Sequence, residues 1–174
     1  MGLVIDLSST IRVIPDFPVK GILFRDITTL LQDARALRSA IDELHARVRD
    51  LRVDVVVGME SRGFIFAAPL AYLLGVGMVP VRKLGKLPGD TLTVEYELEY
   101  GTNTLEIHRD AIRPGERVLV VDDLLATGGT VLATVDLVRQ LGGEVAGAAF
   151  LIELEGLGGR ARLDCEPVIS VLTY

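Results

Sequence analysis

The sequence predicts a doubly wound α/β fold, in which helices cover both faces of a mostly parallel central sheet. Three short, mostly apolar runs, at residues 53–57, 117–121 and 145–152, are too short for helices and too apolar for a half-exposed sheet. Helical patterns lie between them. The chain has 174 residues, of which 49% are hydrophobic and 24% charged, so we expect one globular domain spanning residues 1–174.

The first segment outside this alternation is residues 10–32, which contain several turn residues, among them Pro15 and Pro18. We expect this segment to pack over the sheet as a small hood. Residues 34–51 and 130–141 then repeat apolar residues every three or four positions, which is typical of amphipathic helices. Two glycines follow the second pattern and mark its end.

Residues 63–81 contain no charged residue and are nearly long enough to cross a bilayer. Pro69 and Gly75 interrupt this stretch, and it follows directly on another apolar run. A buried helix over about 62–74 and a strand over about 78–82 therefore fit it better than a membrane span.

A second segment outside the alternation covers residues 83–103. It begins with lysines, glycines and a proline, and it then alternates apolar and polar residues as a strand does. A long polar segment inside a compact domain is typically a functional lid or a protruding hairpin.

The charge balance excludes some classes of partner. There are 18 basic and 24 acidic residues, which give a net charge of -6. This is the wrong sign for a protein that binds nucleic acid by neutralising phosphates. Cys165 is the single cysteine, and His45 and His108 have no partners at metal-ligand spacing, so we expect neither a disulfide nor a protein-built metal site. No signal-type segment opens the chain, which predicts a cytoplasmic protein without a membrane anchor.

The strongest motif is RVLVVDDLLATGGT at residues 117–130, where an apolar strand leads into two carboxylates and a turn that opens a helix. Gly128 and Gly129 allow backbone N–H groups to approach phosphate oxygens, and the helix N-terminus adds its positive dipole end. Thr127 and Thr130 offer hydroxyl donors. The motif predicts a phosphate-binding loop from residue 122 to residue 130.

Asp122 and Asp123 would repel a phosphate if they faced it. We therefore expect them to accept hydrogen bonds from sugar hydroxyls or to orient Mg²⁺ through water. The alternative is that the two aspartates merely end a strand and the following residues merely cap a helix. The chain contains neither a Walker loop nor a dinucleotide-binding glycine pattern.

The motif at 117–130 resembles the signature by which type I phosphoribosyltransferases bind phosphoribosyl pyrophosphate. From about residue 11 to residue 163 the chain is similar to the adenine-using branch of that family. The further matching motifs are PDFPVKGILFRD at 15–26, GMESRGF at 58–64, VRKLGKLP at 81–88 and LEYG at 98–101. Leu84 departs from the basic residue that some members have there, which would weaken one contact to pyrophosphate.

The resemblance also implies roles for individual residues. The main chain at Leu23 and Arg25 would bind the edge of adenine, and Phe24 would stack on its ring. Glu99 would be the general acid–base residue, whereas Tyr100 would close over the site. The donor would be bound by Glu60, Ser61, Arg62, Lys83, Lys86, Asp122, Asp123, Ala126, Thr127, Gly128, Gly129 and Thr130.

Some of these assignments have alternatives from the residues alone. Arg62 could be an ordinary surface residue, and the two lysines could be solvated loop charges. Spacing also does not separate Glu99 from Glu95 and Glu97, which share one face of an extended strand. The resemblance further implies a cis peptide between residues 60 and 61.

Taken together, the resemblance implies a type I phosphoribosyltransferase fold that transfers a phosphoribosyl group from phosphoribosyl pyrophosphate to adenine, giving AMP and pyrophosphate. Mg²⁺ would be bound mainly through the donor, and a homodimer would be the expected state. Two rivals are transfer to a 6-oxopurine or orotate, and a regulator that keeps the fold to sense the donor or a nucleotide. The hood motif argues against the first, and the size and acidity of the chain argue against the second.

Overall fold

The computed structural model describes residues 5–97 and 101–174. The chain divides into two compact units, Met1–Glu43 and Leu44–Tyr174, and helix α2 (Ala34–Val48) crosses the boundary. Helix α2 was predicted to reach residue 51 and ends three residues earlier.

The first unit contains the segment that was predicted as a hood. Its other elements are η1 (Leu7–Thr10), β1 (Arg12–Pro15), β2 (Leu23–Asp26) and α1 (Thr28–Gln32). Strands β1 and β2 form an antiparallel pair. Asp26 ties this hairpin to α1, because its carboxylate accepts hydrogen bonds from the Thr28 N–H at 3.0 Å and from Arg12 Nε at 3.0 Å. These hydrogen bonds lower the pKa of Asp26 to about 2, and the bond from the Thr28 N–H has the largest effect.

The second unit is built on a seven-stranded sheet with the order β5-β6-β4-β3-β7-β8-β9. Its strands are β3 (Val55–Met59), β4 (Gly77–Lys83), β5 (Thr91–Glu97), β6 (Thr102–His108), β7 (Arg117–Leu125), β8 (Glu144–Glu153) and β9 (Val168–Thr173). Its helices are α3 (Gly63–Leu74), α4 (Gly129–Gln140), η2 (Glu155–Leu157) and α5 (Gly159–Arg162). In the order of the sheet, the neighbouring strands β4, β3, β7, β8 and β9 are all parallel, which confirms the predicted fold class.

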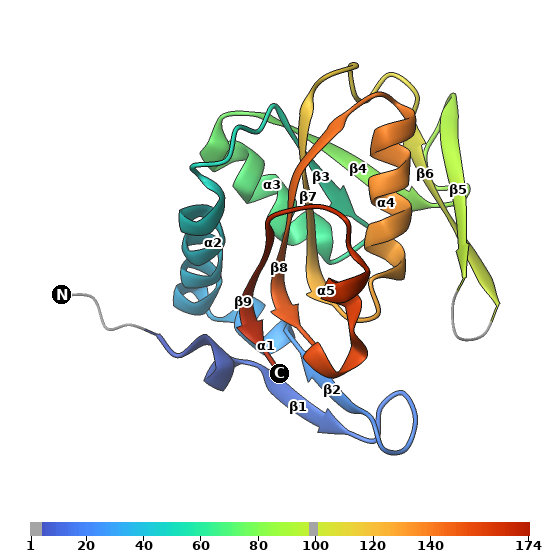
Figure 1. Cartoon of the computed structure of the whole chain (residues 1–174). Coiled ribbons are helices and arrows are strands. Elements are labelled where there is room, and N and C mark those ends of the chain that lie inside the picture. Colours follow the sequence, from blue (N-terminus) through green and yellow to red (C-terminus); the bar gives the residue numbers. More distant parts are fainter. Residues whose placement is uncertain (1–4, 98–100) are drawn as a thin grey trace. The chain divides into compact units, whose positions relative to one another are not determined.

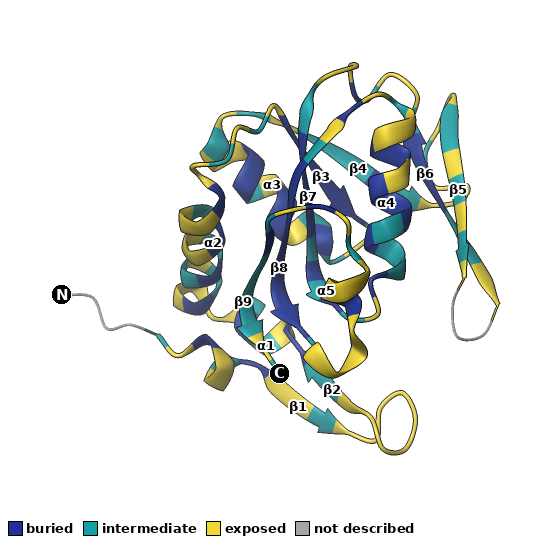
Figure 2. Ribbon diagram, viewed as in Figure 1, coloured by how far each residue is buried: buried dark blue, intermediate teal, exposed yellow. Residues whose placement is uncertain are grey.

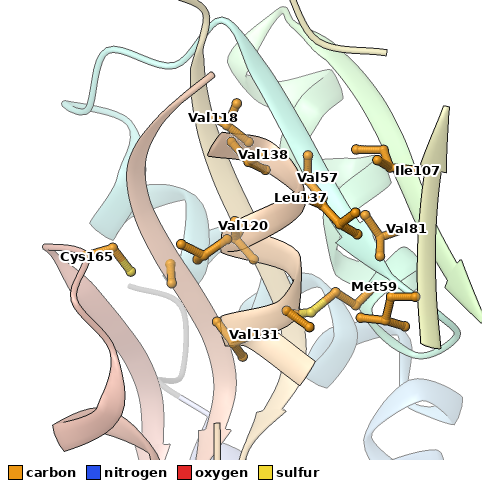
Figure 3. Close-up of a cluster of buried hydrophobic side chains, with 14 of the residues drawn as sticks. Val57, Met59, Val81, Ile107, Val118, Val120, Val131, Leu137, Val138 and Cys165 are labelled. Atoms are coloured by element: carbon orange, nitrogen blue, oxygen red, sulfur yellow. The ribbon is translucent and has the colours of Figure 1, made fainter. Parts of the chain in front are cut away.

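Helices α3 and α4 cover opposite faces of this sheet (Figure 1). Successive side chains of a strand point to opposite faces. Val57 and Val120 therefore pack with Leu137 of α4 in one buried cluster (Figure 3). Gly58 faces α3, where an added Cβ would lie 2.7 Å from the Cβ of Ala67. The central strands are buried along most of their length, which explains their uniformly apolar sequences (Figure 2).

The charge-free stretch at 63–81 forms helix α3 and then most of strand β4, as predicted. Gly75 ends α3 in the left-handed conformation. No helix in the described parts of the chain is long and apolar enough to span a membrane.

Strand β7 is longer than predicted. The sequence analysis ended it at residue 121, whereas it continues to Leu125 by pairing with β8, for example Leu124 with Ile152. The two aspartates therefore lie within the strand, and the connection to α4 shrinks to residues 126–128. The reason is that β8 is also long and offers backbone partners beyond residue 121.

Residues 83–103 include one strand of a protruding hairpin, one of the two alternatives predicted. Strands β5 and β6 pair antiparallel, and β6 joins the sheet beside β4 through Arg82 and Glu106. The chain between the two strands includes residues 98–100, which lie outside the described residues.

Candidate active site

Most of the predicted site residues that the structure describes in the second unit lie at or just after the carboxyl ends of β3 and β7, which are neighbours in the sheet. The chain leaves β3 toward β4 on one side, while β7 lies on the other. Such a reversal of strand order opens a crevice that doubly wound proteins use for ligands. Two short connections meet there, residues 60–62 before α3 and residues 126–128 before α4.

A first cavity of about 200 Å³ lies against the connection between β7 and α4. It is lined by Arg62, Asp122, Asp123, Leu124, Ala126, Thr127, Gly128, Gly129, Thr130 and Val131. In the part of the chain that the structure describes, no acceptor binds the amide N–H groups of residues 127 to 130. Four open donors at the start of a helix form an anion site.

The conformation of Gly128 makes this arrangement possible. Its φ is +84°, in the left-handed region that side chains disfavour, and it precedes the first residue of α4. Its carbonyl accepts the first helical hydrogen bond, from Leu132 N–H at 2.9 Å. The backbone conformation therefore favours glycine at residue 128, whereas the approach of its N–H to a phosphate stays a prediction.

Asp122 and Asp123 are held by different partners. Asp123 Oδ2 lies 2.8 Å from Arg62 Nε, and the side chain of Asp123 is only 6% exposed. Asp122 Oδ1 accepts the N–H of Asp123 at 2.8 Å. Burial raises the pKa of both carboxyls; the charge of Asp123 raises that of Asp122 further, whereas Arg62 opposes the rise at Asp123.

A second cavity of about 240 Å³ adjoins the first. It is lined by Glu60, Ser61, Arg62, Lys83, Tyr96, Asn103, Leu105, Asp122, Asp123 and Thr130. Arg62, Asp122, Asp123 and Thr130 line both cavities. The site therefore suits a ligand with two anionic groups joined by a polar centre. One anionic group would bind the open amides of residues 127–130, and the other would lie beside the cationic side chains of Arg62 and Lys83.

The turn between β3 and α3 has the backbone that the resemblance implied, since the peptide bond between Glu60 and Ser61 is cis. Gly63 packs tightly on β7, where a Cβ would lie 2.8 Å from Asp122 Oδ1. The start of α3 therefore packs directly against the Asp122 carboxylate of β7, which leaves no room for a side chain at residue 63.

Glu60 is anchored inside the protein. Its Oε2 accepts hydrogen bonds from Arg82 Nε at 3.2 Å and from the Lys83 N–H at 3.0 Å. Burial raises the pKa of Glu60, but these bonds outweigh burial and the pKa is lowered overall. Its carboxylate positions the end of β4; a direct contact with ligand stays a prediction.

Sequence reasoning missed Glu106, which organises the loop after β4. Glu106 is 3% exposed, and its Oε1 accepts the N–H groups of Lys86 and Leu87 at 2.7 Å each. Lys86 itself is exposed and is not among the residues that line the two cavities. A carboxylate between two apolar residues, Leu105 and Ile107, is the signal that could have found this residue.

Tyr96 and Asn103 of the hairpin were also missed, although both line the second cavity. The hydroxyl of Tyr96 lies 3.4 Å from Thr130 Oγ1, which connects β5 to the start of α4. The sequence analysis covered Tyr96 only within the alternating pattern of residues 83–103. Glu95 and Glu97 share the exposed face of β5, whereas Glu99 and Tyr100 lie outside the described residues.

The three predicted base-binding residues belong to β2 in the first unit. The ring of Phe24 meets the ring of Phe17 edge to face, with centroids 5.1 Å apart. Leu23 is 57% exposed, and Phe24 and Arg25 are half-buried.

Comparisons with known proteins all identify the same family. The family model described as a phosphoribosyl transferase domain matches residues 26–168. An adenine phosphoribosyltransferase of Chloroflexus aurantiacus is 61% identical over 97% of this chain and 98% of its own length. The crystal structure of the Thermoanaerobacter pseudethanolicus adenine phosphoribosyltransferase is similar with a TM-score of 0.94 and 54% identity, covering 97% of this chain and 98% of that one.

A second similar structure was solved with ligands. It is the Saccharomyces cerevisiae adenine phosphoribosyltransferase in complex with an imino-altritol bisphosphate and adenine. It is 41% identical, with a TM-score of 0.90, and the match covers 96% of this chain and 97% of that one.

Proposed function

Because the chain belongs to the phosphoribosyl transferase domain family, we propose that it transfers the 5-phosphoribosyl group of phosphoribosyl pyrophosphate to adenine, producing AMP and pyrophosphate. The observation that carries this proposal is the row of open amide groups at residues 127–130, beside a second cavity lined by Arg62 and Lys83. The reaction assigned to this pair of cavities is a phosphoribosyl transfer that serves purine salvage.

Each part of the donor has a matching part of the site. The 5-phosphate binds the amide groups of the first cavity, which cost no reorganisation because they are already unpaired. The pyrophosphate binds in the second cavity against Arg62 and Lys83. The ribose hydroxyls lie between them and donate hydrogen bonds to Asp122 and Asp123.

We assign Mg²⁺ to the donor rather than to a protein cage. The carboxylates of the half-buried Asp122 and the buried Asp123 line both cavities, so oxygen atoms suited to the waters of a magnesium ion are present. When bound with the donor, Mg²⁺ would supply positive charge to the pyrophosphate oxygens, and Asp122 and Asp123 would hold its waters. Chelation of Mg²⁺ is expected to stop turnover, as a product assay with excess chelator would show.

The base is assigned to the hood. The backbone at Leu23 and Arg25 binds the edge of adenine, and Phe24 supplies an aromatic face. In the described chain β2 forms a two-stranded antiparallel sheet with β1, and Leu23, Phe24 and Arg25 are consecutive residues of β2. Glu99 handles the proton on adenine N7 while N9 attacks the ribosyl C1, and Tyr100 closes the site against water.

The experiment that tests the proposed function is a product assay. Purified protein is incubated with Mg²⁺, phosphoribosyl pyrophosphate and adenine, and AMP and pyrophosphate are separated and quantified. Equal amounts of the two products are expected. Tight binding of the donor without any product would instead support a sensor of the donor.

Replacing Gly128 by valine should raise the KM for phosphoribosyl pyrophosphate by about 100-fold, because a β-branched residue is strained at positive φ and its Cβ would lie 3.1 Å from Gly159 O. Gly129→Ala is the matched control, since φ at residue 129 is ordinary and the nearest atom to an added Cβ is Tyr96 Cδ2 at 3.4 Å. Its loss should be much smaller. If folded Gly128→Val binds ribose 5-phosphate as well as the parent does, the loop is not the phosphate site.

A homodimer is proposed from the surface of α3. This helix contains no charged residue, yet Ile65, Tyr72 and Leu73 are 38%, 84% and 42% exposed. Tyr72→Glu should shift the protein toward monomer in sedimentation equilibrium, while Arg35→Glu, on α2, should not. A parent protein that sediments as a monomer at micromolar concentration would rule out the dimer.

A cytoplasmic location stays a prediction.

A further inference from the structure

We propose that Arg162 and Gly159, on the short helix α5, act as positioning residues for the phosphate loop, an inference that rests on the proposed function. Neither residue lines the first cavity. Their effect runs through the carbonyl groups of residues 126 and 127, which they hold in fixed directions.

Two contacts join α5 to the loop. Arg162 Nη1 donates a hydrogen bond of 2.7 Å to the carbonyl oxygen of Thr127. Gly159 lies so close to the loop that a Cβ on it would overlap the carbonyl oxygen of Ala126. Gly128 in turn packs on the backbone of Gly159. All three loop residues therefore contact α5.

The geometry of the peptide bond converts these contacts into a binding site. In a trans peptide the C=O of one residue and the N–H of the next point in opposite directions. The bonds between residues 126, 127 and 128 are trans. A Thr127 carbonyl held by Arg162 therefore turns the Gly128 N–H the other way, and an Ala126 carbonyl held on Gly159 does the same for the Thr127 N–H. These are two of the open donors described above.

Arg162 also prevents the opposite orientation. If the Thr127 peptide flipped, its carbonyl oxygen would face the phosphate oxygens, and two acceptors in contact repel. A charged donor on the carbonyl makes this flip costly, because hydrogen bonds to charged groups are stronger than neutral ones.

The helix that carries Arg162 is itself firmly attached. Arg160, two residues earlier, donates to the buried Glu153 through Nε at 2.8 Å and to the Val168 carbonyl through Nη1 at 2.7 Å. Glu153 is 3% exposed and also accepts a hydrogen bond from Ser170. Helix α5 is thus tied to β8 and β9, and Arg162 extends from a rigid base to the loop.

The test compares Arg162→Ala with Arg162→Lys and with Arg139→Ala. Arg139 is the matched control, since its guanidinium is exposed and donates a hydrogen bond to Asp164. Asp164 follows α5 closely in the chain and is not part of the loop. Arg162→Ala should raise the KM for phosphoribosyl pyrophosphate roughly 10-fold, the loss of one charged hydrogen bond, with the KM for adenine and the melting temperature unchanged. Arg162→Lys, which retains a cationic donor, should recover part of this loss. Arg139→Ala should behave as the parent.

Affinity for ribose 5-phosphate, measured by calorimetry, gives a readout that does not depend on turnover. It should fall for Arg162→Ala by the same factor as the donor KM rises. An unchanged affinity and an unchanged donor KM would overturn the positioning role while leaving the proposed function intact. Equal losses for Arg139→Ala would overturn it too, because they would assign the effect to charge alone. A parent protein that binds ribose 5-phosphate but makes no AMP would refute the transferase activity without affecting this comparison.

Discussion

With phosphoribosyl pyrophosphate as donor, nucleotide formation from adenine is expected to exceed that from hypoxanthine by about 10⁴-fold in kcat/KM. A backbone C=O facing the 6-amino group and an N–H facing ring N1 match adenine. A 6-oxopurine presents an acceptor and a donor at these two positions, the reverse of adenine. The wrong base would therefore leave groups of the hood at Leu23 and Arg25 unpaired, which costs more than a lost contact.

The measurement is a set of parallel assays with adenine, hypoxanthine, guanine, xanthine and orotate, each followed by absorbance. The affinity for ribose 5-phosphate is the control, because the phosphate loop should bind it equally whatever the base. Near-equal rates with adenine and hypoxanthine would refute recognition by the main chain of β2. A preference for orotate would show that the hood motif was assigned to the wrong base.

The parts of the site that could be predicted are those in which local sequence determines local structure. Gly128 adopts positive φ, and a loop of small residues after a buried strand must begin the next helix with unpaired amides. Parallel strands bring their carboxyl ends to one edge, so the motifs after β3 and β7 had to meet. The resemblance assigned Arg62 and Asp123 to one site, and the ion pair between them, 2.8 Å from Nε to Oδ2, lies at this edge.

The parts that could not be predicted depend on residues far apart in the chain. Arg162 contacts Thr127 across 35 positions, and Glu106 binds the amide of Lys86 across 20. Nothing near Arg162 indicates such a contact, since an arginine on a short polar helix is ordinarily a solvated charge. The apolar neighbours of Glu106 indicate that it is buried, but they do not identify the amides that it binds. The end of β7 was misplaced for a related reason: its last residues pair with β8, whose length is not visible from β7 alone.

Glu99→Gln should lower kcat by roughly 10² to 10⁴, the usual contribution of a general acid–base residue. Glutamine keeps the size of the side chain and one carbonyl oxygen but does not exchange a proton, so the KM for phosphoribosyl pyrophosphate should change little. Glu99 lies outside the described residues, and its role rests on the match of LEYG to the family motif.

Glu95→Gln and Glu97→Gln are the matched controls, since both residues are exposed on β5 and have the same charge and the same spacing. Steady-state kcat values for the three variants, with melting temperatures to confirm folding, separate the catalytic proton from a general effect of negative charge on the hairpin. Because a lost surface carboxylate changes only long-range electrostatics, which salt screens, the two controls should retain most of the parent's activity. Equal losses in all three variants would mean that the hairpin acts through its charge, and equal retention would mean that adenine N7 exchanges its proton with another group.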